Sequence, residues 1–75
     1  MTMRKVTMGP EEAKELVRIA TKCDFDIDIS YNRYTVDAKS ILGVLAMDFS
    51  KVLTISYNGR DEELERFLSG FAMAC

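Results

Sequence analysis

The spacing of apolar residues along this chain changes between a period of two and a period of three to four, and 75 residues allow few folds with that alternation. Residues 5–8 and 24–30 alternate apolar with polar side chains, which predicts strands with one buried face. Residues 13–23 instead place apolar side chains along one side of a helix. A chain of this length builds one core, so we predict a single domain over residues 1–75.

A helix start follows the first predicted strand. Pro10 suits the first helical position, because its ring presets the backbone and its missing N–H would have no partner there. Gly9 is positioned to cap this helix, and Glu11 and Glu12 place negative charge at the positive end of the helix dipole. We therefore predict an amphipathic helix that begins at Pro10 and packs its apolar side against a sheet.

The rest of the chain predicts a hairpin, a short helix, another strand and a final helix. Residues 31–34 are typical of a tight hairpin turn, and residues 52–57 are rich in strand-forming side chains. Ser40 is a good cap for a short helix in the apolar run 40–47, and residues 61–75 repeat the helical pattern. The order β-α-β-β-α-β-α predicts an α+β fold of the open-faced β-sandwich type. In it, two longer helices and one short helix cover one face of a four-stranded antiparallel sheet.

Charge and composition exclude several classes of function. Ten basic and twelve acidic residues give a net charge of −2, without the basic cluster that nucleic acid binding requires. The longest apolar run is far shorter than the roughly 20 residues that span a bilayer, so we predict a cytoplasmic protein without a membrane partner. Cys23 and Cys75 lack metal-ligand spacing, and the aspartates of residues 24–30 line one face of a strand instead of converging. We expect two free thiols, no metal and no cofactor.

The stretch VDAKSILGVL at residues 36–45 and the order of elements resemble HPr, the small phosphocarrier of the bacterial sugar phosphotransferase system. The resemblance extends in weaker form from about Ala13 to the acidic start of the last helix, and so covers most of the chain. It implies the HPr-like open-faced sandwich. It also implies protein partners of three kinds: an HPr-type serine kinase, a transcriptional regulator, or another component of the phosphotransferase system.

The carrier site of that family is missing here. In HPr a histidine just before the first helix, followed closely by an arginine and a proline, accepts phosphate from Enzyme I and passes it to sugar transporters. The corresponding stretch is Gly9, Pro10, Glu11 and Glu12, and the whole chain contains no histidine. Because neither glycine nor proline has a nucleophilic side chain, we predict a degenerate carrier site, no histidine phosphocarrier activity and no enzyme. One alternative is an unconventional phosphocarrier that forms a carboxyl phosphate at Glu11 or Glu12.

Ser40 occupies a position of known importance in the family. In HPr-like proteins of Gram-positive bacteria, the serine at this position is phosphorylated by a dedicated ATP-dependent kinase as part of catabolite control. A phosphoserine at a helix cap lies against free backbone N–H groups. Capping alone also explains a serine there, because serine is among the best capping residues. The sequence leaves both interpretations open: a cap, or a cap that is also a regulatory phosphorylation site.

The apolar run after Ser40 is longer than one face of a short helix can bury. In HPr this patch docks Enzyme I, the serine kinase or a transcriptional regulator, so we predict partner docking through Ile41, Leu42, Leu45 and Met47. The simpler alternative is that Ile41, Val44 and Leu45 are ordinary core. We therefore predict an HPr-like regulatory or protein-interaction module, similar to the catabolite-repression paralogues that also lack the histidine. A further alternative is a structural module that associates with itself as a homodimer.

Overall fold

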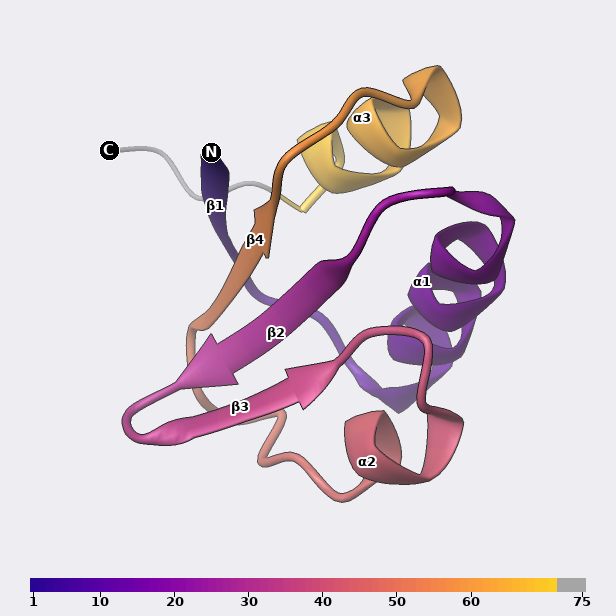
Figure 1. Ribbon diagram of the computed structural model, residues 1–75. Coiled ribbons are helices and arrows are strands. Elements are labelled where there is room, and N and C mark those ends of the chain that lie inside the picture. Colours follow the sequence, from indigo (N-terminus) through magenta and orange to yellow (C-terminus); the bar gives the residue numbers. More distant parts are fainter. Residues whose placement is uncertain (72–75) are drawn as a thin grey trace.

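The computed structural model describes residues 1–71, which form a four-stranded antiparallel sheet with three helices on one side (Figure 1). The predicted α+β open-faced sandwich is confirmed. The strands lie in the order β1-β4-β2-β3, so the first strand forms one edge and half of a hairpin forms the other. In chain order the elements are β1 (Thr2–Val6), α1 (Pro10–Lys22), β2 (Ile27–Tyr31), β3 (Tyr34–Asp37), α2 (Ile41–Leu45), β4 (Leu53–Tyr57) and α3 (Glu62–Ser69).

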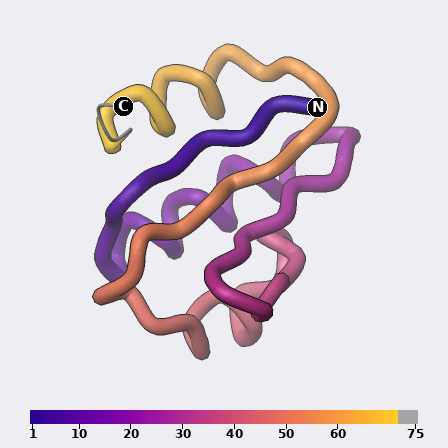
Figure 2. The backbone as a smooth tube through the Cα atoms, turned by 90° about the vertical axis from the view of Figure 1, so that its left-hand side faces the viewer, coloured from indigo at the N-terminus to yellow at the C-terminus, as the bar shows by residue number. Residues whose placement is uncertain are grey.

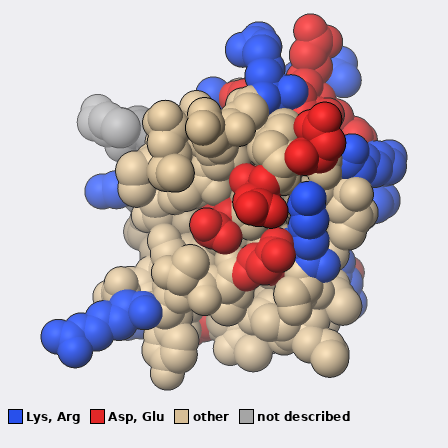
Figure 3. Space-filling model, in the orientation of Figure 1, with Lys and Arg blue, Asp and Glu red and all other residues tan. Residues whose placement is uncertain are grey.

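Alternation along the strands sends one set of side chains toward the helices and the other toward solvent. Ile55 of β4 stands opposite Ile29 of β2, and both are buried in the core. Asp28, the neighbour of Ile29, is exposed and stands opposite the exposed Asp37 of β3. Figure 3 views the molecule from this open side, where acidic side chains gather near the centre. Of the aspartates predicted to line a strand, Asp28 therefore lies on the uncovered face of the sheet, while Asp24 and Asp26 precede β2.

Strand β2 begins later than the predicted strand over residues 24–30. It starts at Ile27, and Phe25 instead turns to stack on Tyr57 of β4, with 6.0 Å between the ring centroids. Gly59 lies against the same phenyl ring, and a Cβ at that position would overlap it. This contact between residues far apart in sequence replaces the first part of the strand.

Helix α1 begins where it was predicted to begin. Gly9 is the cap, Pro10 is the first helical residue, and the Gly9 N–H donates to the Glu12 carboxylate at 2.8 Å. At the other end of the helix, the Lys39 ammonium donates to the Cys23 carbonyl at 3.0 Å. Cys23 is a free, buried thiol, and burial raises its pKa.

Helix α3 is shorter than the predicted helical pattern over residues 61–75. Asp61 caps it through a 2.9 Å hydrogen bond from the backbone N–H of the third helical residue. The helix ends at Ser69, and the following Gly70, a residue type of low helix propensity, is its C-cap. Cys75, which was predicted to share the apolar face, lies outside the described residues.

A cluster of three side chains joins β1, β4 and α3. Arg4 donates from Nη2 to Glu65 Oε1 at 2.6 Å, and the Tyr57 hydroxyl donates to Glu65 Oε2 at 2.6 Å. Arg4 Nε also donates to the Tyr57 hydroxyl at 3.3 Å. Figure 2 shows β1 and β4 side by side with α3 along them. Burial raises the pKa of Tyr57, and its hydrogen bond to the Glu65 carboxylate raises it further.

This cluster makes stability fall in alkaline solution. Below pH of about 10, both the folded and the unfolded chain keep the Tyr57 proton. Above it, the unfolded chain releases the proton while the folded chain retains it, so the free energy of unfolding decreases as pH rises toward the raised pKa of Tyr57. Tyr57→Phe is expected to cost about 0.5–1.5 kcal/mol near neutral pH, and the difference from wild type should shrink above pH of about 10.

Urea unfolding followed by circular dichroism at several pH values measures this effect. Tyr34→Phe is the matched control, because Tyr34 is 66% exposed and its variant should keep the wild-type pH dependence. A constant difference between wild type and Tyr57→Phe across the alkaline range would contradict the assignment.

Candidate functional site

The residues predicted to form a degenerate carrier site, Gly9, Pro10, Glu11 and Glu12, lie at the start of α1, and both carboxylates have structural partners. Glu12 accepts the Gly9 N–H, and Glu11 forms an exposed ion pair with Lys14 at 3.4 Å. Pro10 and Gly9 contribute no nucleophilic atom. The arrangement starts a helix, and it presents carboxylates where a phosphate group would be repelled.

Ser40 caps α2, as predicted. Its Oγ accepts the Gly43 N–H at 3.4 Å, and its carbonyl accepts the Val44 N–H at 2.9 Å. Ser40 is exposed, so its hydroxyl combines the capping contact with access from solvent. The ammonium of the neighbouring Lys39 donates to the Cys23 carbonyl at the end of α1, at 3.0 Å.

Three side chains of α2 form an exposed apolar surface, which we call the α2 patch: Ile41, Leu42 and Leu45. Leu42 is 82% exposed, while Ile41 and Leu45 are 40% and 38% exposed. Val44 is buried against the sheet. The interpretation of Ile41 and Leu45 as fully buried core is therefore wrong.

Met47 is a correction to the predicted docking surface, because it is only 7% exposed and belongs to the core. The helix ends at Leu45, and the Met47 N–H then donates to the Val44 carbonyl at 3.1 Å. This turn places Met47 on the same inward side as Val44. The apolar run alone did not reveal where the helix stops, and so it did not reveal which side of the run is covered.

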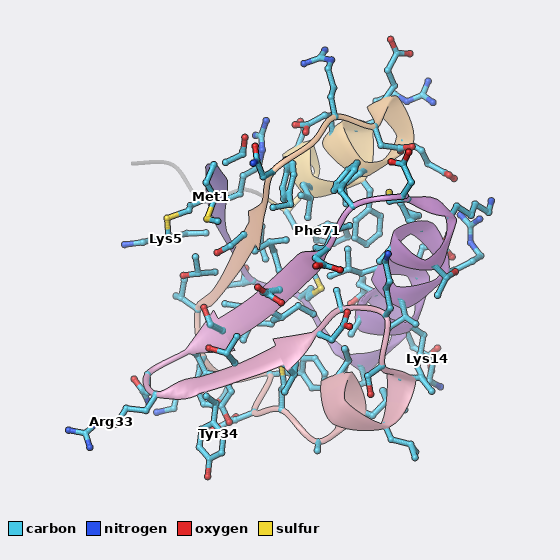
Figure 4. The ribbon with its side chains drawn as sticks, viewed as in Figure 1. Met1, Lys5, Lys14, Arg33, Tyr34 and Phe71 are labelled. Carbon is cyan, nitrogen blue, oxygen red and sulfur yellow. The ribbon has the colours of Figure 1, made fainter. Side chains whose placement is uncertain are left out.

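A cavity of about 300 Å³ lies between the hairpin and α2, and sequence analysis did not find it. The smallest residues that line this cavity are Gly43 and Ala46. Tyr31 is held at the edge of the cavity, because its hydroxyl accepts a hydrogen bond from the Asp48 N–H at 3.3 Å. The Tyr34 ring extends below the hairpin (Figure 4). The lining residues are Tyr31, Tyr34, Val36, Gly43, Ala46 and Met47.

Metal sites and membrane-spanning helices are both absent from residues 1–71. No three His, Cys, Asp or Glu side chains lie close enough together there to hold a metal ion. None of the helices in the same part of the chain is long and apolar enough to cross a membrane.

Replacing Ser40 with alanine tests the cap. Loss of the Oγ contact to Gly43 is expected to lower the free energy of unfolding by about 1 kcal/mol, within the usual range of about 0.5–2 kcal/mol for a lost cap. Thermal unfolding followed by circular dichroism measures it. Equal stability of the Ser40→Ala variant and wild type would contradict the capping role.

A comparison with models of known protein families shows to which family this chain belongs. A family model described as the PTS HPr component phosphorylation site matches residues 11–69, which is well over half of the chain. The chain belongs to the HPr family. Proteins of this family are phosphocarriers rather than enzymes, and they interact with other components of the phosphotransferase system. The match begins at Glu11, directly after Gly9 and Pro10.

Solved structures show the same fold. The phosphocarrier protein HPr from Bacillus anthracis is 29% identical with a TM-score of 0.69, and the alignment covers 93% of this chain and 95% of that one. HPr-C-His from Thermoanaerobacter tengcongensis is 25% identical with a TM-score of 0.71, covering 93% and 89%. Crh, the catabolite repression containing protein of Bacillus subtilis, is 21% identical with a TM-score of 0.63, covering 93% and 88%, and its structure shows domain swapping in a dimer.

Proposed function

We propose that this HPr-family protein works in the cytoplasm by binding protein partners through the α2 patch, not by carrying phosphate on histidine, and that phosphorylation of Ser40 regulates this binding. One observation carries the proposal: Leu42, two residues after the Ser40 cap, is 82% exposed in a chain that contains no histidine.

The α2 patch has the properties of a protein-binding surface. Leu42 projects into solvent between the half-buried Ile41 and Leu45, and α2 carries no charged side chain. Burying such a surface removes apolar area from water without desolvating a charge, which favours association with a complementary apolar surface. The partner classes that fit are an HPr-type serine kinase, a transcriptional regulator and a component of the phosphotransferase system, while nucleic acid and membrane remain outside the proposal.

The surroundings of Ser40 support its role as a phosphorylation site. Its hydroxyl is exposed to solvent, and a phosphate on this oxygen would lie beside the backbone N–H groups at the start of α2. The first turn of α2 contains no acidic residue. A phosphate would add about −1.5 to −2 charges next to an otherwise uncharged apolar patch, which changes the partners that this surface fits.

Phosphorylation is tested with ATP and an HPr-type serine kinase, followed by mass spectrometry of the intact chain and of its peptides. The expected result is one added phosphate on Ser40, retained in Ser50→Ala and lost in Ser40→Ala. Absence of an adduct at Ser40 would remove the regulatory part of the proposal.

Docking is tested by titrating the same kinase with labelled protein. Leu42→Ser is expected to weaken binding by about tenfold or more, because an exposed apolar anchor is lost. Met3→Ser removes an equally apolar side chain that is 66% exposed on β1, and it should bind like wild type. Equal binding by Leu42→Ser and Met3→Ser would show that the α2 patch is not the docking surface.

A further inference from the structure

The surface around α2 combines a projection with a hollow. Leu42 is 82% exposed, and Ala46, one helical turn later, lines the cavity of about 300 Å³ together with Gly43. The most exposed side chain of α2, Leu42, therefore lies within one helical turn of the two smallest residues in this segment, Gly43 and Ala46. A cavity of this volume is at the lower end of ligand pockets and large enough to receive one aliphatic side chain.

Such a face is complementary to itself. When a projection and a hollow lie side by side, a two-fold axis between them places each projection in the hollow of the other copy. We propose that two copies of this chain associate through this face, with Leu42 of each copy inserted into the cavity between the hairpin and α2 of the other.

The charge distribution permits this contact between identical surfaces. Each copy has a net charge of −2, but α2 and the cavity lining contain no ionised side chain at neutral pH. Figure 3 shows few charged atoms along the lower part of the molecule, where the hairpin and α2 lie. Arg33 extends outward from the tip of the hairpin (Figure 4). Bringing two copies together at α2 therefore places uncharged side chains of α2 and the cavity lining on one another, with the exposed Asp48 at the edge of the contact.

The size of the face makes this association weak and reversible. Stable protein interfaces bury about 1,200–2,000 Å² in total, and a five-residue helix with one hairpin supplies less. We expect a dimer that forms at high concentration and dissociates on dilution. Because Leu42 also belongs to the proposed docking surface, the dimer and a partner complex would exclude one another.

Sedimentation velocity of the full chain, from about 10 μM to about 1 mM, tests the proposal. The weight-average mass of wild type is expected to rise with concentration and to return to the monomer value on dilution. Leu42→Ser removes the projection, and Ala46→Met fills the hollow while adding apolar surface. Each is expected to weaken self-association by about tenfold or more. Met3→Ser is the control and should behave like wild type.

Several outcomes would overturn the inference. One is a monomer at every concentration. A second is a dimer that Ala46→Met leaves unchanged, because general stickiness of the apolar surface would then explain it. A third is a dimer lost in Met3→Ser, which would place the contact on the edge strand β1. The proposed docking function is measured separately, as kinase binding at protein concentrations far below those at which the chain self-associates. The dimer proposal can therefore be wrong while the docking proposal holds, and the reverse.

Discussion

Replacing Leu16 with alanine is expected to lower the free energy of unfolding by about 2–5 kcal/mol. Leu16 lies on the inward side of α1 and is fully buried against the sheet. Its truncation removes apolar contacts and leaves a cavity that a small core refills only in part. A chain of this length has a total stability of about 4–11 kcal/mol, so the variant is expected to lose a large share of its stability. Urea unfolding followed by circular dichroism gives the measurement.

Leu42→Ala is the matched control for this prediction. The same chemical change is made in a leucine that is 82% exposed, and it should alter the free energy of unfolding by less than about 0.5 kcal/mol at low protein concentration. If Leu42→Ala were as damaging as Leu16→Ala, α2 would have to pack differently and Leu42 would not be a free surface residue.

Incubation with Enzyme I and phosphoenolpyruvate is expected to leave the chain without a transferable phosphate, a complete loss compared with a histidine-containing HPr. No imidazole is present, and Gly9 and Pro10 occupy the start of α1. The Glu12 carboxylate already accepts the Gly9 N–H, and Glu11 pairs with Lys14. A phosphate at this end of α1 would meet two carboxylates instead of the bidentate partner that an arginine provides.

Intact mass, read before and after hydroxylamine treatment, measures this outcome, with a histidine-containing HPr as the positive control in the same mixture. A hydroxylamine-labile phosphate that disappears in Glu11→Gln or Glu12→Gln would instead establish the carboxyl phosphocarrier. That result would replace the docking function as the primary activity of the chain.

Local rules accounted for most of the fold. Pro10 starts α1 because the first turn of any helix leaves N–H groups unpaired and favours a residue that lacks one, and Gly9 before it is the cap. Ile27 and Ile29 point inward and the aspartates outward because successive side chains of a strand alternate. Ser40 caps α2 because its side chain reaches a nearby N–H. Each of these depends on neighbours within a few positions, which the sequence displays directly.

The candidate site depended on contacts between distant segments. Met47 and Leu42 are both apolar residues of one run, and only the end of α2 and its position on the sheet decide that the first is buried and the second exposed. Lys39 reaches the end of α1 instead of remaining beside Ser40. The cavity exists because the hairpin places two tyrosines across from the small residues of α2.

The sequence by itself therefore determined the order of the elements, the inward and outward faces of the strands and the absence of a carrier histidine, because periodicity, caps and composition are local properties. Only the tertiary structure decided which apolar side chains of α2 stay in solvent and where the hollow beside them lies. The physical reason is that burial depends on which surfaces meet when helix, hairpin and sheet pack together, and that information is distributed over the whole chain.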